Sequence, residues 1–379
     1  MALMKSRFLK AILTAPLAPF AAAAGAPVSY KKAHIKQPQL KFSPDGKFRI
    51  LHLTDIHEVD PEMDDDENRA VPRDKSIEAV NVIKKSIEKT NPDLIVFGGD
   101  NINGYWEELT YDYISKTVEK ITAPIREKGI PFAVVFGNHD SEIYKNFREF
   151  QMMLYMQYDN FIGCLNSEEM YGCGNCNILI KSGKSDKPAY NIWLIDSNDY
   201  PYSESGERLP GYDCVHKSQL DWYERTAEKL KKENGGKPLP SILFQHIPVI
   251  QECDAVEETT ADCPDAIYEK GEDKYYTLKE EYKISGEMKE LPSPPANGDR
   301  TQFELWKRHG DVIAAFFGHD HVNDFIIEVD GIKLVQTFST GYHTYGDKRG
   351  GRLIVLDENE PDNIFTESFV IDRITNTEF

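Results

Sequence analysis

Short apolar runs alternate with amphipathic stretches through the first part of the chain. Residues 75–90 and 111–129 carry apolar side chains at helical spacing, which predicts two helices. The apolar runs have the length of strands and end in polar residues; they are residues 48–55, 93–100 and 130–140. Strands that alternate with helices in this order predict a βαβαβ unit, the pattern of an α/β fold in which helices cover a sheet.

The remainder of the chain continues this pattern with one long interruption. We expect further helices at residues 142–158 and 217–233. Further strands are expected at residues 176–181, 191–196, 240–246 and 312–321, and antiparallel strands within 324–338, 352–358 and 365–372. Residues 247–299 are polar and rich in Glu, Pro and Gly, which predicts an insertion lying over one face.

The first residues have the composition of an export signal. Lys5, Arg7 and Lys10 form a basic start, and the following residues to 24 are mostly small and apolar. We therefore expect a signal peptide at residues 1–24, an N-terminal extension at 25–44 and one domain at 45–375. A disordered tail or a short anchor is the alternative. Export would place the protein in a periplasm, in the lumen of the secretory pathway or outside the cell.

Composition and charge narrow the partners. The 379 residues are 40% apolar, as in globular proteins, and the net charge is −19. Such acidity argues against nucleic acid as the main partner and against an anionic membrane surface. No segment after the signal has 18 uninterrupted apolar residues, so no stable membrane insertion is expected. The oligomeric state stays open.

Six cysteines follow the predicted signal; they are Cys164, Cys173, Cys176, Cys214, Cys253 and Cys263. An even number in an exported chain favours disulfides, although six cysteines allow 15 pairings. Cys253 and Cys263 are close in sequence and are a reasonable local pair. Cys173 and Cys176 form a single CxxC, and no second CxxC completes a zinc site.

Polar residues of metal-ligand type gather at the ends of five expected strands. They are Asp55 and His57, Asp100, Asn138 with His139 and Asp140, His246, and His319 with His321. The carboxyl ends of sheet strands are where α/β folds place their sites. One such fragment occurs often by chance, but burying so many polar groups is costly without a partner of opposite charge. Together, the five fragments predict a metal site.

The ordered motifs D-x-H, G-D-N, G-N-H-D, H and G-H-D-H resemble the calcineurin-like metallophosphoesterase superfamily over residues 45–372. The stretches GHDHVND and GYHTYG most resemble the purple-acid-phosphatase-like proteins of plants and their fungal relatives. The resemblance implies a four-layer α/β/β/α sandwich with mixed sheets and two metal ions at its rim.

The resemblance also implies a role for each motif residue. Asp55, His57 and His321 would hold one ion, Asn138, His246 and His319 the other, and Asp100 would bridge them. His139 would face the leaving group, with Asp140 orienting it. Purple acid phosphatases usually have a tyrosine where this chain has Asn103, and leave the position of His57 as glycine. We therefore expect neither a tyrosinate ligand nor a purple colour.

The chemistry of such a centre follows from its ligands. Mixed oxygen and nitrogen donors suit Mn, Fe or Zn better than Ca or Mg. Two ions lower the pKa of a shared water, and the resulting hydroxide attacks phosphorus while His139 protonates the leaving oxygen. The sequence predicts a metal-dependent phosphomonoesterase whose substrate is a phosphate ester. The alternatives are a phosphodiesterase on the same site and a non-catalytic metal-binding module.

The surroundings of the site are less defined by sequence. Tyr342, His343 and Tyr345 are candidates for substrate contact. For His343, a position in a loop near the surface is an equally supported alternative. The acidic run at residues 60–68 is either a solvated loop or a cover that repels anionic substrates. No Arg or Lys stands beside a motif as an obvious phosphate clamp.

Overall fold

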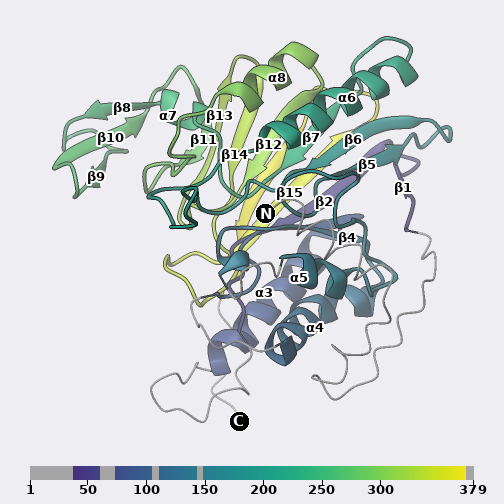
Figure 1. Ribbon diagram of the computed structural model, residues 1–379, viewed down its shortest axis with the longest axis horizontal. Coiled ribbons are helices and arrows are strands. Elements are labelled where there is room, and N and C mark those ends of the chain that lie inside the picture. Colours follow the sequence, from purple (N-terminus) through teal and green to yellow (C-terminus); the bar gives the residue numbers. More distant parts are fainter. Residues whose placement is uncertain (1–36, 60–72, 105–110, 143–147, 373–379) are drawn as a thin grey trace.

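Two β-sheets face each other at the centre of the molecule, and helices cover the outer face of each (Figure 1). The computed structural model describes residues 37–59, 73–104, 111–142 and 148–372. The expected signal peptide and the acidic run at residues 60–68 lie outside these ranges. Within these ranges, no helix combines the length and apolar character that crossing a bilayer requires.

The smaller sheet has five strands, in the order β16 (Phe365–Val370), β15 (Gly350–Asp357), β2 (Lys47–Leu53), β3 (Leu94–Gly98) and β4 (Phe132–Val135). The strands β2, β3 and β4 are parallel, and β15 runs antiparallel to β2 and β16. The helices on its outer face are α3 (Arg73–Thr90), α4 (Tyr111–Lys128) and α5 (Arg148–Tyr155). This confirms the predicted βαβαβ unit.

The larger sheet has eight strands. Their order is β1 (Leu40–Lys41), β5 (Cys176–Lys181), β6 (Pro188–Leu194), β7 (Ser241–Phe244), β12 (Val312–Phe317), β14 (Ile332–Gln336), β13 (Asp324–Val329) and β11 (Lys283–Glu287). The central strands β6, β7, β12 and β14 are parallel; β13 runs antiparallel to β14, and β11 runs antiparallel to β13. The helices α6 (Lys217–Glu233) and α8 (Thr301–His309) cover its outer face in Figure 1.

Three apolar cores fill the three interfaces between these layers. Alternate residues of a strand point to opposite faces, so Ile50 of β2 joins the core between the sheets and Leu51 joins the core under α3 and α4. Between the sheets, the rings of Phe244 and Phe316 stack with centroids 5.3 Å apart. Trp306 of α8 belongs to the third core, on the outer face of the larger sheet. The predicted four-layer α/β/β/α sandwich with mixed sheets is thereby confirmed.

The structure adds detail at the expected boundaries of the domain and of the insertion. The short strand β1 lies before residue 45 but pairs with β5, and Leu40 is buried between the sheets. The polar segment contains α7 (Gln251–Asp254) and a small sheet of β8 (Val256–Thr259), β10 (Lys274–Leu278) and β9 (Ile267–Glu269), which projects from one end of the molecule (Figure 1). Its last strand, β11, belongs to the main sheet instead.

No disulfide joins the six cysteines, all of which lie within the described residues, so the expected disulfides stay a prediction. Cys253 lies in α7 with its Sγ atom 3.9 Å from the carbonyl oxygen of Pro292. The strand β8 then carries the chain about 13 Å outward before Cys263, at about 3.3 Å per residue. The strand β8 and a turn lie between the two cysteines in the chain, and no disulfide joins them.

The core between the sheets makes a testable contribution to stability. We expect Phe316→Ala to lower the free energy of unfolding by about 4 kcal/mol, because the ring leaves a cavity that two sheets cannot close. Phe365→Ala, whose side chain is 54% exposed on β16, should change it by less than about 1 kcal/mol. Urea denaturation of the metal-free protein measures both values, and equal losses would contradict this assignment of the core.

Candidate metal centre

Five loops at the carboxyl ends of five strands meet at one edge of the sandwich. The strands β2, β3 and β4 belong to the smaller sheet, and β7 and β12 belong to the larger one. The loops carry Asp55 and His57, Asp100, Asn138, His246, and His319 and His321, in that order. All seven side chains are buried. Both sheets therefore contribute to the centre.

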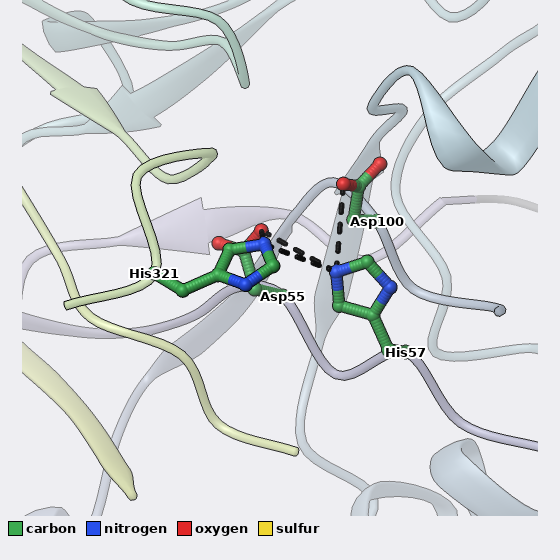
Figure 2. Close-up of side chains that lie close together, drawn as sticks. All are labelled: Asp55, His57, Asp100 and His321. Atoms are coloured by element: carbon green, nitrogen blue, oxygen red, sulfur yellow. Dashed lines mark hydrogen bonds and ion pairs between the residues drawn. The ribbon is translucent and has the colours of Figure 1, made fainter. Parts of the chain in front are cut away.

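One group of four side chains converges within bonding range of a single ion. Figure 2 shows Asp55, His57, Asp100 and His321 pointing toward one another. The Nε2 atom of His57 lies 3.5 Å from Asp100 Oδ2 and 3.3 Å from the Nε2 atom of His321. His321 Nε2 in turn lies 3.2 Å from Asp55 Oδ1. Two lone pairs at this distance repel each other, so the two nitrogens need a proton or a metal cation between them.

A second group shares Asp100 with the first. Asp100, His246 and His319 each direct one donor atom into a common space. The Nε2 atom of His246 lies 3.1 Å from Asp100 Oδ2. The buried carbonyl oxygen of Asn138 is a further candidate donor. Two groups that share Asp100 agree with the arrangement that the family resemblance implies.

Five donor atoms are buried and make no aligned hydrogen bond within the described residues, although His246 Nε2 lies 3.1 Å from Asp100 Oδ2 and His321 Nε2 lies 3.2 Å from Asp55 Oδ1. These atoms are Asp55 Oδ1, Asp100 Oδ2, Asn138 Oδ1, His246 Nε2 and His319 Nε2. Leaving one such atom unpaired costs about 1–3 kcal/mol, and more for a charged group. Cations of the Mn, Fe or Zn type, which accept mixed oxygen and nitrogen donors, would give these atoms partners. The residues present therefore fit a pair of metal ions.

Surrounding groups hold the other end of each donor side chain. Asp55 Oδ2 accepts hydrogen bonds from Thr54 Oγ1 at 2.8 Å and from the backbone N–H of His319 at 3.1 Å. Asp100 Oδ1 accepts one from the backbone N–H of His139 at 2.8 Å. The Nδ1 atom of His246 lies 2.9 Å from the carbonyl oxygen of Gly98, to which it donates. Each contact leaves the opposite atom of that side chain facing the centre.

The loop backbone is strained where it turns the donors inward. Asp55, His57, Asp100 and His319 have φ values of 53°, 45°, 49° and 74°, in the left-handed region that costs energy for residues other than glycine. Gly318 allows the loops to meet, because a Cβ atom there would overlap Thr54 Oγ1 and Asp55 Oδ2. Four donor residues thus keep a conformation that the packing around them must stabilise.

The charges in this centre are balanced by histidine. Burial lowers the pKa of His57 to about 3 and, with the charge of His246, lowers that of His319 to about 3. Burial alone would lower the pKa of His246 as well, but the carboxylates of Asp100 and Asp55 raise it to about 10. His57 and His319 are therefore neutral, whereas His246 carries a proton that a bound metal ion would have to displace.

His139 stands beside this group and is oriented by Glu142, which corrects the role predicted for Asp140. The imidazole Nδ1 atom of His139 donates to Glu142 Oε2 at 2.6 Å. The carboxylate of Asp140 instead accepts backbone N–H bonds from Asn101, Ile102 and Gly137, at 2.9 to 3.1 Å. Asp140 thus ties the loop after β3 to the loop after β4, and burial, with the charge of Asp100, raises its pKa to about 7.

The loop at residues 341–346 contributes one residue that sequence reasoning missed. Thr344 bonds through Oγ1 to Nδ1 of His321, and Tyr345 stacks on the His321 ring with centroids 4.3 Å apart. His343 lies 3.3 Å from Ser76 Oγ on α3, and Tyr342 packs under the guanidinium of Arg349. Of the three predicted substrate residues, Tyr345 thus contacts a donor side chain. The sequence offers one indication of Thr344: it is a hydroxyl residue between two of the predicted substrate residues, His343 and Tyr345.

Comparison with known proteins gives consistent matches. Residues 48–323 match the family model described as calcineurin-like phosphoesterase. Probable inactive purple acid phosphatase 14 of Arabidopsis thaliana is 31% identical over 344 residues, covering 84% of this chain and 77% of that protein. The phosphatase DCR2 of Saccharomyces cerevisiae is 26% identical over 300 residues, covering 77% of this chain and 47% of that protein.

Among solved structures, a dimetal phosphatase from Danio rerio superposes with a TM-score of 0.53. The superposition covers 85% of this chain and 95% of that chain, at 12% sequence identity. At this identity the likeness concerns the fold alone.

Metal binding should stabilise the folded chain, and this effect can be measured without an activity assay. We expect Mn²⁺ at about 100 times its Kd to stabilise the metal-free protein by about 2.7 kcal/mol per site, seen as a higher Tm. Asp100→Asn should lose most of this shift, because it removes the charge that both groups share. Asp330→Asn is the matched control, since Asp330 also has a positive φ (48°) but pairs with Lys307 at the surface. An unchanged shift in Asp100→Asn would contradict the assignment.

The separate roles of Asp140 and Glu142 predict losses of stability of different size. Asp140→Ala leaves three buried N–H groups without their acceptor, so we expect the free energy of unfolding to fall by about 3 kcal/mol. Glu142→Ala should lower it by about 1 kcal/mol or less, because its partners are closer to solvent. Urea denaturation of both metal-free variants checks this. A larger loss for Glu142→Ala would show that the two roles are assigned the wrong way round.

Proposed function

Because this chain belongs to the calcineurin-like phosphoesterase family, as its strand-end motifs predicted, we propose that it is a metal-dependent phosphatase acting on phosphate monoesters. The observation that carries the proposal is the convergence, from both sheets, of buried carboxylate and imidazole donor atoms that make no aligned hydrogen bond within the described residues. The names of the relatives divide on activity: those from Arabidopsis are called probable inactive, and the yeast protein is called a phosphatase. Activity is therefore argued from the residues of this chain.

The residues around the centre support a pair of bound ions. Asp55, His57 and His321 would hold the first, and Asn138, His246 and His319 the second, with Asp100 between them. When bound, such ions supply polarisation of a phosphoryl oxygen and activation of a water molecule. The choice among Mn, Fe and Zn stays open, since all three accept these donors.

His139 is the proposed proton donor to the leaving group. Its side chain is 14% exposed, beside donor side chains that are nearly all inaccessible, so it lines the side from which substrate would approach. Burial alone would lower the pKa of His139, but Asp100 and Glu142 outweigh it and raise the pKa above its ordinary value. A protonated imidazole at this place can deliver its proton to the departing oxygen. The centroid of the His139 ring lies 5.2 Å from that of the His57 ring, which places His139 beside the centre.

Hydrolysis of model esters tests the proposal. Protein loaded with Mn²⁺ should hydrolyse 4-nitrophenyl phosphate faster than bis(4-nitrophenyl) phosphate, lose this activity on chelation and regain it on reloading. His139→Ala should lower kcat by about 100-fold or more while the protein still binds two ions. His309→Gln is the control, because His309 precedes β12 and lies at the opposite end of that strand from His319.

Three other outcomes decide between the alternatives. A preference for the diester would replace the proposed phosphatase with a phosphodiesterase on the same residues. Two bound ions without turnover of either ester would favour a binding role. No bound ion after reloading would remove the basis of the proposal.

A further inference from the structure

A hairpin from the larger sheet reaches the candidate proton donor. Residues 200–209 leave the end of β6, turn, and return, with a β-bridge between Tyr202 and Arg208. The base of the hairpin is anchored by Arg148 of α5, which bonds both oxygens of Asp196 at 2.7 and 2.8 Å and lies 3.4 Å from Asp199 Oδ2. The Nη1 atom of Arg148 makes both contacts to Asp196, and its Nη2 atom faces Asp199, so one guanidinium joins the two carboxylates just before Tyr200.

That residue, Tyr200, connects two side chains of the centre. Its hydroxyl donates to Glu142 Oε1 at 2.6 Å, and the second oxygen of Glu142 accepts the Nδ1–H of His139 at 2.6 Å. The same hydroxyl accepts an N–H of the Asn138 amide at 3.0 Å. The guanidinium of Arg208 covers the Tyr200 ring and lies 3.8 Å from Glu142 Oε1. The hydrogen bonds form a continuous chain from Asn138 through Tyr200 and Glu142 to His139.

The direction of this chain determines which atom of Asn138 faces the centre. A carboxylate only accepts, so Tyr200 must donate to Glu142 and has lone pairs left for an incoming N–H. The amide nitrogen of Asn138 therefore points to Tyr200, and its carbonyl oxygen faces the other donor atoms. With the amide reversed, Tyr200 would have to donate to Asn138, and an N–H₂ group would meet the cations. One tyrosine hydroxyl thus excludes the wrong amide orientation.

We propose that Glu142 and Tyr200 are positioning residues: Glu142 sets the imidazole orientation of His139, and Tyr200 sets both Glu142 and the amide of Asn138. The inference rests on the proposed function for its effect on turnover. Its effect on metal binding does not depend on turnover. Nothing in the five strand-end motifs points to Tyr200, because it reaches the centre from a different loop.

Leaving-group dependence tests the role of Glu142. Phenyl phosphate has a poor leaving group that needs a proton, whereas 2,4-dinitrophenyl phosphate has a good one that does not. On metal-loaded full-length chain, Glu142→Gln should lower kcat for phenyl phosphate about 30-fold and for the dinitrophenyl ester less than about 3-fold. Glu207→Gln, an exposed glutamate of the same hairpin, should change neither. Equal losses on both esters, or no loss on either, would overturn the role of Glu142.

Metal affinity tests the role of Tyr200 without any substrate. Tyr200→Phe removes the hydroxyl and keeps the ring, so we expect one of the two Mn²⁺ ions to bind about 10-fold more weakly, measured by calorimetric titration. Tyr202→Phe, exposed on the same hairpin, is the control and should bind both ions as the wild type does. Unchanged affinity for both ions in Tyr200→Phe would overturn its role.

The two measurements separate failure of this inference from failure of the proposed function. If the wild-type protein hydrolyses phenyl phosphate but both variants behave like their controls, the inference is wrong and the phosphatase stands. If the wild-type protein hydrolyses neither ester, the phosphatase proposal fails and the role of Glu142 fails with it. The titration of Tyr200→Phe still decides the role of Tyr200 in that case.

Discussion

The structure depends on compensating two buried carboxylates. Asp55 and Asp100 are inaccessible to water, lie on neighbouring loops and each keep one oxygen without a hydrogen-bond partner among the described residues. Such charges are tolerated only where opposite charge is close. Burial would raise both pKa values. The charges of His246 and His321 hold the pKa of Asp55 below its ordinary range, and those of His246 and His139 do the same for Asp100. The strained backbone at these residues and the glycines around them follow from the need to bring donors to this one place.

The sandwich converts this requirement into a coupling between its two sheets. The smaller sheet supplies both carboxylates, and the larger sheet supplies His246, His319 and His321. The centre therefore forms only when the sheets are packed against each other through the core that contains Phe244 and Phe316. A metal ion bound at this edge would in turn hold the sheets together, so metal binding and folding reinforce each other.

The strand ends were predictable from sequence because each is an apolar run followed by a ligand-type residue, and parallel strands bring such ends together. Contacts between side chains of different loops were not predictable in this way. Glu142 carried a signal that could have been used: residues 139–141 form a 3₁₀ turn, in which side chains three apart share a face. Tyr200 carried none, because its distance from Asn138 depends on how the second sheet docks. The strand β8, between Cys253 and Cys263, was likewise not apparent in a segment that reads only as polar.

The most direct test is a crystal structure of the Mn²⁺-loaded protein with anomalous scattering recorded for manganese. We expect two anomalous peaks, with Asp100 contacting both ions, Asp55, His57 and His321 around one, and His246 and His319 around the other. The carbonyl oxygen of Asn138 should lie against the second ion while its nitrogen contacts Tyr200. A single peak, or two peaks that Asp100 does not join, would contradict the account.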